Sequence, residues 1–123
     1  MPLQISIRES GDVTILDLQG RATISDGESD LLRSKLDQLI ASNVRKLLLN
    51  LADLTHVDSS GFSVIVKICA ALRGQGGDLR LVRPTGPALM AFNILRLLDL
   101  IPTFNNEHEA LASFRSTDFF AQP

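Results

Sequence analysis

Lys46-Leu-Leu-Leu-Asn-Leu51 and Asp58-Ser59-Ser60-Gly61 are the two short stretches on which the predicted architecture of this chain depends. The first is a short apolar run, which is typical of a strand covered on both faces of its sheet. The second places residues that favour helix N-terminal caps in front of an apolar segment that continues to about Arg73. With a loop predicted from Ala52 to Val57 between them, the sequence predicts a strand, a connection and a helix.

The flanking segments extend this unit in both directions. Upstream, two alternating segments separated by Gly11-Asp12 predict a hairpin, and Ser25-Asp-Gly-Glu28 has the form of a capping box that begins a helix, with Asn43 as its left-handed C-terminal cap. The predicted strands are residues 3–7, 13–18, 46–51, 79–82 and 103–104, and the later helices are residues 58–73, 85–98 and 107–114. Strands that alternate with helices favour parallel pairing through right-handed crossovers. We therefore expect an α/β fold with a mixed, mostly parallel sheet of about four to five strands and about four helices.

Composition and charge exclude several classes of protein. The 123 residues, 45% hydrophobic and 21% charged, are typical of one folded domain. Lys and Arg total 12 against 14 Asp and Glu, without a basic cluster, so a nucleic-acid partner is not expected. The single cysteine, Cys69, excludes an internal disulfide and a thiolate metal cluster. No signal peptide is recognisable, and the most apolar stretch, from Val64 to Leu72, is too short to span a bilayer, so we expect a cytoplasmic protein with no membrane insertion.

The Asp58-Ser59-Ser60-Gly61 segment allows two interpretations. In the first, Asp and Ser only satisfy the free N–H groups at the start of a helix, and Gly61 permits close packing. In the second, a serine here is a phosphorylation site, because the helix dipole favours an anion at this end. A phosphoserine adds about −1.5 to −2 charges beside Asp58, which would repel a partner docked across the helix start. A serine at this position can therefore act as an off-switch.

The helix that follows has apolar residues on all sides of its axis. Between Phe62 and Leu72 the only charged residue is Lys67. Such a helix is either buried completely or contacts a partner, and complete burial is difficult in a small domain. Phe62 and Val66 are therefore predicted partner-binding residues, with a purely structural role in the core as the alternative.

One pattern in the sequence resembles a known family. Asn50-Leu51-(x)-Asp53-Leu54-(x-x)-Val57-Asp58-Ser59-Ser60-Gly61 is similar to the signature of the STAS family, the sulphate-transporter and anti-sigma-factor-antagonist domain. Leu18-Gln19-Gly20 resembles its early strand-end motif, and Gly76-Gly77-Asp78-Leu79 and Glu109-Ala110-Leu111 resemble its later landmarks. The resemblance predicts a STAS domain over residues 3–114 and a C-terminal tail over residues 115–123.

This resemblance implies a βα superhelical fold and a regulatory function without catalysis or a cofactor. Stand-alone bacterial members bind an anti-sigma factor that is also a serine kinase of the ATPase fold, and so release a sigma factor. By the resemblance, this kinase would phosphorylate Ser59 and switch the antagonist off, and a phosphatase would reverse the modification. Asp58, Ser60 and Gly61 would shape the phosphorylation loop.

Alternatives in other classes have less support. A phosphorelay receiver would carry an acidic pair after its first strand and a late lysine, whereas here a hairpin follows and the last lysine is Lys67. A serine hydrolase would carry Gly-x-Ser-x-Gly at its nucleophile, which is missing. His56 and His108 lie too far apart in the sequence to suggest a metal site, so no metal is expected.

Two alternatives stay open at this point. Within the same family, the chain can be an accessory subunit of a lipid-transport ABC system or of a stress-signalling assembly, in which the serine is an interface residue. The oligomeric state is also open, because Phe119-Phe120 are consistent with either a homodimer contact or a frayed end.

Overall fold

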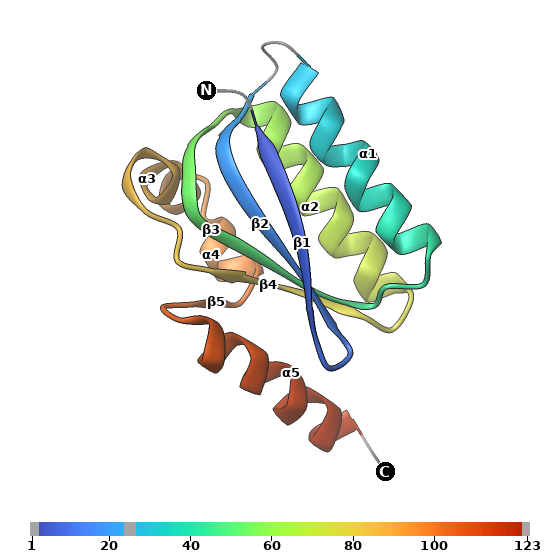
Figure 1. Cartoon of the computed structure of the whole chain (residues 1–123). Helices are drawn as coiled ribbons and strands as arrows, with labels where there is room; N and C mark the ends of the chain where they lie inside the picture. The colour runs from blue at the N-terminus through green and yellow to red at the C-terminus, as the bar shows by residue number, and fades with distance from the viewer. Residues whose placement is uncertain (1–2, 24–26, 122–123) are drawn as a thin grey trace.

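The computed structural model describes residues 3–23 and 27–121, without the side chains of residues 28 and 116–121. A five-stranded sheet, in which the strands lie side by side in chain order, forms its centre. Helices α1 and α2 cover one face of the sheet, and α5 lies against the other face (Figure 1). The predicted α/β class is confirmed.

In chain order the elements are β1 (Gln4–Ser10), β2 (Val13–Ala22), α1 (Glu28–Ala41), β3 (Lys46–Val57), α2 (Ser59–Gly74), β4 (Asp78–Val82), α3 (Gly86–Ile94), α4 (Leu97–Leu100), β5 (Thr103–Phe104) and α5 (Glu107–Ala121). β1 and β2 form an antiparallel hairpin, while β2, β3, β4 and β5 pair in parallel. The sheet is therefore mixed and mostly parallel, as predicted.

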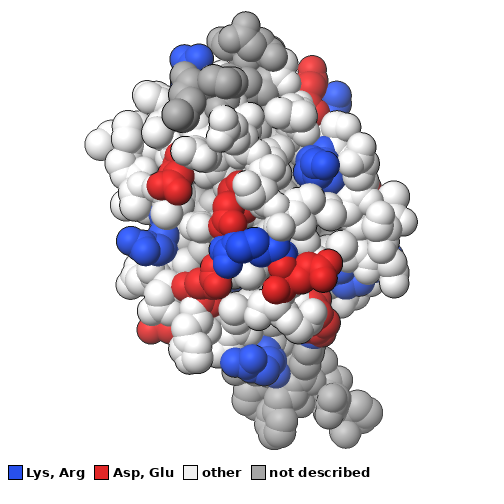
Figure 2. All heavy atoms as spheres, in the orientation of Figure 1, with Lys and Arg blue, Asp and Glu red and all other residues white. Residues whose placement is uncertain are grey.

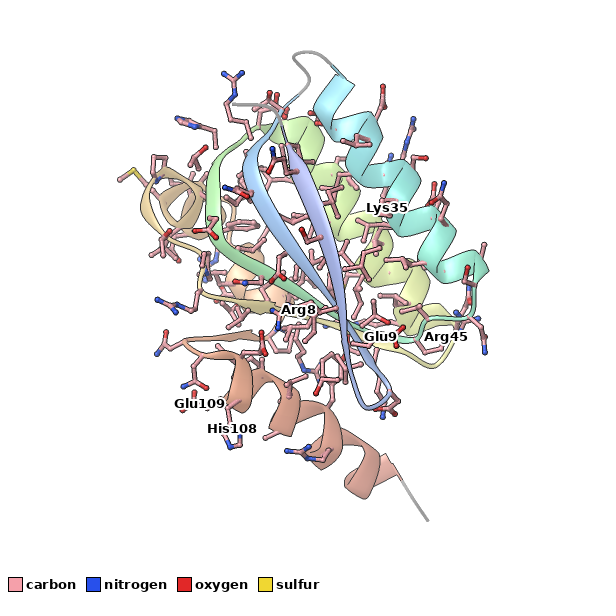
Figure 3. All side chains as sticks on the ribbon, in the orientation of Figure 1. Arg8, Glu9, Lys35, Arg45, His108 and Glu109 are labelled. Atoms are coloured by element: carbon pink, nitrogen blue, oxygen red, sulfur yellow. The ribbon has the colours of Figure 1, made fainter. Side chains whose placement is uncertain are left out.

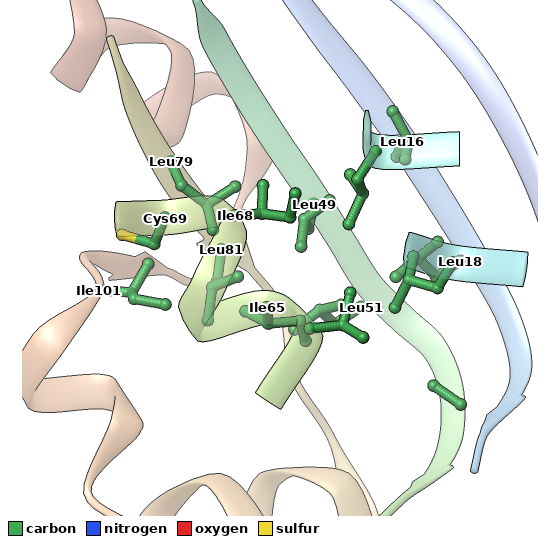
Figure 4. Packing of buried hydrophobic residues seen from close by; sticks show 14 of the residues in the cluster. Leu16, Leu18, Leu49, Leu51, Ile65, Ile68, Cys69, Leu79, Leu81 and Ile101 are labelled. Atoms are coloured by element: carbon green, nitrogen blue, oxygen red, sulfur yellow. The ribbon is translucent and has the colours of Figure 1, made fainter. Parts of the chain in front are cut away.

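The leucine run of β3 supplies both sides of the core, because successive strand residues point to opposite faces. On the α2 side, Leu49 pairs with Leu16 of β2 and Leu81 of β4, and all three are fully buried (Figure 4). On the other side, Leu48 packs with Phe114 of α5 in a second apolar cluster. The prediction that this strand is covered on both faces is confirmed.

The prediction of a loop from Ala52 to Val57 is wrong, because β3 continues to Val57. β2 also runs further than predicted, to Ala22, and provides partners for the added residues: Gly20 pairs with Leu54, and Ala22 with Val57. The side chain of Leu54 is 1% exposed. Strand pairing and burial thus stabilise the added part of β3, and neither can be recognised from the local sequence pattern.

Helix ends differ from the predictions in three places. α1 begins at Glu28 with Gly27 in a left-handed conformation before it, and the predicted cap Ser25 lies outside the described residues. The third helix was predicted to continue to Leu98, but it ends at Ile94, because Arg96 adopts a left-handed φ of 58° before the short α4. α5 continues past the predicted end at Phe114 to Ala121. The side chains of Phe119 and Phe120 are not among those that the structure describes.

Asn43 follows α1 with a φ of 72°, so the predicted left-handed cap is confirmed. Asparagine tolerates this conformation better than most residues, because its short polar side chain can bond locally. The chain then turns directly into β3.

Arg8 joins the hairpin to α5 on the face of the sheet that α1 and α2 leave uncovered (Figure 3). Its guanidinium donates from Nε to Asp17 Oδ2 over 2.6 Å and from Nη2 to Glu107 Oε1 over 2.6 Å. Charges of both signs alternate across this face (Figure 2). The cluster therefore fixes the start of α5 against β1 and β2 without creating a patch of one sign.

Asp17→Asn is expected to lower the free energy of unfolding by about 1 kcal/mol at pH 7 and by far less at pH 2. The hydrogen bonds from Arg8 hold the pKa of the Asp17 carboxyl below its ordinary value, against the opposing effect of burial. A carboxyl with a lowered folded-state pKa stabilises the fold above its unfolded pKa of about 3.9, and the contribution is lost as the pH falls through the folded pKa. Urea unfolding at both pH values measures the difference.

The control for this prediction is Asp37→Asn, which neutralises an exposed carboxylate on α1. We expect its effect to stay within about 0.5 kcal/mol at both pH values. An equal loss for Asp17→Asn at pH 7 and at pH 2 would contradict the ionic contribution of Asp17.

Candidate functional site

The Asp58-Ser59-Ser60-Gly61 segment lies where the carboxyl ends of β2 and β3 meet the start of α2. In parallel α/β sheets this edge is the usual position of binding sites. The backbone N–H of Asp58 donates to the carbonyl oxygen of Ala22 over 3.3 Å, so the end of β2 holds the start of the helix directly. The first turn of α2 is thereby anchored to the sheet.

Asp58 is the N-terminal cap of α2. Its backbone is extended, and its Oδ1 accepts hydrogen bonds from the backbone N–H groups of Ser60 at 3.0 Å and Gly61 at 3.2 Å. The same oxygen accepts from Ser60 Oγ at 2.5 Å. The capping interpretation is therefore correct for Asp58, and it leaves the function of the serines open.

Gly61 is required by the closeness of the two strand ends. A Cβ at this position would lie 2.4 Å from the carbonyl oxygen of Ala22 and 2.7 Å from Val57 Cγ2. Neither contact is tolerated in a folded protein, and the first is to backbone. A glycine here lets the first turn of α2 lie directly on the sheet.

The two adjacent serines have different environments. Ser59 is exposed, and within the described part of the chain its hydroxyl makes no hydrogen bond. Ser60 is half-buried, and its hydroxyl contacts both Asp58 and the hydroxyl of Ser29, which comes from the first turn of α1. Only Ser59 is thus presented to another protein with an unengaged hydroxyl.

Ser29 was not singled out from the sequence. It lies 31 residues before Ser60, and no motif connects the two positions. Its side chain is 6% exposed, which is unusual for a serine, but burial becomes apparent only once α1 packs against α2.

Most of the apolar surface of α2 is buried. Phe62 is 6% exposed, and its ring meets that of Phe92 of α3 edge to face, with 4.9 Å between the ring centres. Val66 is half-buried and packs against the same cluster. The partner-binding role of Phe62 and Val66 stays a prediction, and of the two Val66 has the more accessible side chain.

The Phe62–Phe92 contact also places α3 beside the start of α2. The outer side of α3 is apolar, with Met90 65% and Ile94 72% exposed. Thr85, just before this helix, donates from Oγ1 to the carbonyl oxygen of Ala52 at 3.2 Å and so holds α3 to β3. An exposed apolar strip, Met90 and Ile94, therefore belongs to the helix that neighbours the serine site.

Three observations on the described residues concern the alternative functions. His56, the histidine nearest to the serines in sequence, has its Nδ1 3.1 Å from the hydroxyl of Thr55. The described side chains contain no group of three His, Cys, Asp or Glu residues placed to hold a metal ion. Within the same residues, every helix is too short or too polar to cross a bilayer.

The sequence is similar to a known protein family and to characterised proteins. The STAS domain model matches residues 4–110. The anti-sigma F factor antagonist of Paenibacillus polymyxa is 28% identical over 112 residues, which cover 90% of this chain and 94% of that protein.

Solved structures show the same fold. A Thermotoga maritima protein, provisionally titled an anti-sigma factor antagonist, superposes with a TM-score of 0.83 at 23% identity and covers 90% of this chain and 94% of that one. The Bacillus cell fate determinant SpoIIAA in its phosphorylated form gives a TM-score of 0.67 at 19% identity, covering 90% and 97% of the two chains.

Proposed function

The chain belongs to the STAS domain family, and on that premise we propose that it is an anti-sigma factor antagonist that phosphorylation of Ser59 switches off. In this proposal it binds an anti-sigma factor that is a serine kinase, and so releases a sigma factor in the cytoplasm. A phosphatase restores the active form, and the antagonist itself catalyses no reaction and needs no cofactor. The observation that carries the proposal is the exposed, unengaged hydroxyl of Ser59 at the start of α2.

The geometry around Asp58 explains how a phosphate on Ser59 would act. The Asp58 carboxylate already accepts from the N–H groups of Ser60 and Gly61, so these donors are occupied. A phosphate on Ser59 would therefore add about −1.5 to −2 charges next to an existing negative charge. The effect is a change of surface charge at the docking site, with no need for the domain to refold.

Two comparisons support the proposal. The similar Paenibacillus polymyxa protein is named an anti-sigma F factor antagonist, and SpoIIAA, which shares the fold, exists in a phosphorylated form. The exposed apolar strip lies on α3, the helix whose Phe92 packs against Phe62 in the first turn of α2, and it supplies a surface that an anti-sigma factor can cover. Exposed apolar groups rimmed by polar residues are typical of protein interaction sites.

Ser59→Asp is expected to weaken partner binding by roughly 30- to 150-fold relative to Ser59→Ala, a cost of about 2–3 kcal/mol. The reason is the concentration of negative charge at the docking surface, where the new carboxylate adds to Asp58, together with the cost of removing water from the new charge. Both variants are used as baits in a lysate of the host, and the affinity of the retained protein is then measured by calorimetry. Ser34→Asp, at an exposed serine on α1, is the charge-matched control.

The outcomes separate the candidate functions. Recovery of an anti-sigma factor with an ATPase fold by Ser59→Ala and Ser34→Asp, but not by Ser59→Asp, supports the proposal. Recovery of ABC-transporter subunits by all three baits would mean that Ser59 is an interface residue and that the chain is a transport accessory. Equal affinity of the alanine and aspartate variants for an anti-sigma factor would remove the switch.

A further inference from the structure

The buried Ser29 and the half-buried Ser60 form a chain of hydroxyl groups that ends on Asp58. An ionised carboxylate can only accept hydrogen bonds, so the Ser60 hydroxyl must donate its proton to Asp58 Oδ1, 2.5 Å away. The proton between the two serines must then come from Ser29, whose Oγ contacts Ser60 Oγ. Ser29 therefore donates a hydrogen bond to Ser60, and Ser60 donates one to Asp58.

Ser29 is held in place by its own backbone and by burial. Its N–H donates to the carbonyl oxygen of Thr23 over 2.9 Å, and its side chain is 6% exposed. A buried hydroxyl needs a hydrogen-bond partner, because an unpaired one is costly. Ser60 supplies that partner, so the first turns of α1 and α2 are joined through these two side chains.

We propose that Ser29 is a positioning residue that keeps the Ser60 hydroxyl turned inward and so restricts phosphorylation to Ser59. This inference rests on the proposed function of Ser59. Phosphoryl transfer forms a bond from the serine Oγ to the γ-phosphorus of ATP, breaks the bond from that phosphorus to the ADP oxygen, and passes the hydroxyl proton to a base of the kinase. Ser60 Oγ has its proton engaged by Asp58 and a lone pair engaged by Ser29. Ser59 Oγ has neither constraint.

The positioning role can be measured without a kinase, by amide hydrogen exchange followed by NMR. Ser29→Ala removes the donor that holds Ser60, and the exchange rate of the Gly61 N–H is expected to rise about five- to tenfold. Ser34→Ala, the same substitution on the exposed side of α1, should leave that rate unchanged.

A double-mutant cycle separates positioning from a general loss of packing. If Ser29 acts through Ser60, then Ser29→Ala should add nothing to the Gly61 exchange rate in a Ser60→Ala background. Effects of the two substitutions that simply add would overturn the proposal. So would a rise spread evenly over core amides such as those of Leu49 and Leu81, because it would show global destabilisation.

The choice of serine is tested with ATP and the kinase that the Ser59→Ala bait retains, with the modified residue located by mass spectrometry. Ser59→Ala should take up no phosphate, whereas Ser29→Ala combined with Ser59→Ala should be phosphorylated on Ser60. Two results would overturn the role of Ser29. The first is phosphate on Ser60 in the Ser59→Ala variant. The second is a double variant without phosphate on Ser60 although the unmodified chain is phosphorylated on Ser59. An unmodified chain that stays unphosphorylated counts against the proposed function, and the exchange cycle then still decides whether Ser29 positions Ser60.

Discussion

Phe62→Ala is expected to lower the free energy of unfolding by about 3–4 kcal/mol. The ring is 6% exposed and contacts Phe92 edge to face. Its removal leaves a cavity between α2 and α3 and also removes an aromatic pair. Urea unfolding measures the change. The control is Met90→Ala, because Met90 is 65% exposed and its truncation should cost less than about 0.5 kcal/mol.

The result also decides what Phe62 contributes to partner binding. A domain typically has about 5–15 kcal/mol of stability, so Phe62→Ala can remain folded at low temperature while its affinity is measured. If the folded variant binds the anti-sigma factor as tightly as the unmodified chain, Phe62 acts only in the core. A loss of affinity with little loss of stability would instead assign Phe62 to the docking surface. The same pair of measurements on Val66→Ala tests the more accessible of the two positions.

Gly61→Ala is expected to cost about 3 kcal/mol, at the upper end for added volume in a packed site. The new Cβ would lie 2.4 Å from the carbonyl oxygen of Ala22, and that oxygen belongs to a strand fixed by pairing with Val57. Because the backbone cannot move away cheaply, the first turn of α2 must shift instead. Thermal and urea unfolding report the loss of stability, and the amide shifts of Ser59 and Ser60 report the displacement.

Gly74→Ala is the matched control for this substitution. Gly74 is the last residue of the same helix, its φ is not positive, and a Cβ there meets nothing within 4 Å. Because alanine favours helix more than glycine does, this variant should be neutral or more stable by up to about 1 kcal/mol. Similar losses for Gly61→Ala and Gly74→Ala would show that helix propensity, not contact with β2, decides the cost.

The predicted parts of the fold are those that depend on neighbours in sequence. The unbroken run of Leu47, Leu48 and Leu49 indicates a strand with two covered faces, because successive side chains in a strand point to opposite faces of the sheet. Asp58 caps the N–H groups of Ser60 and Gly61, which are its neighbours two and three positions on. Such local signals also identified the candidate switch segment.

The loop predicted from Ala52 to Val57 was wrong because this part of the chain has a partner that is distant in sequence. β3 continues to Val57 because β2, more than 30 residues earlier in the sequence, pairs with it as far as Ala22. Arg8 meets Glu107 across 99 positions of sequence. Nothing in a local window specifies which distant strand or charge will be adjacent, since this is settled by the packing of the whole domain.

The serine pair shows the division most clearly. Residue type and position relative to Asp58 are enough to predict a capped helix start that carries a modifiable hydroxyl, but Ser59 and Ser60 are chemically identical side chains. Their difference arises when α1 packs beside α2 and brings Ser29 against Ser60, which engages the half-buried Ser60 hydroxyl in a hydrogen-bonded chain and leaves that of Ser59 in solvent. The family resemblance already favoured Ser59, but burial and hydrogen bonding are properties of the assembled fold, so only the tertiary structure supplies a physical difference between the two serines.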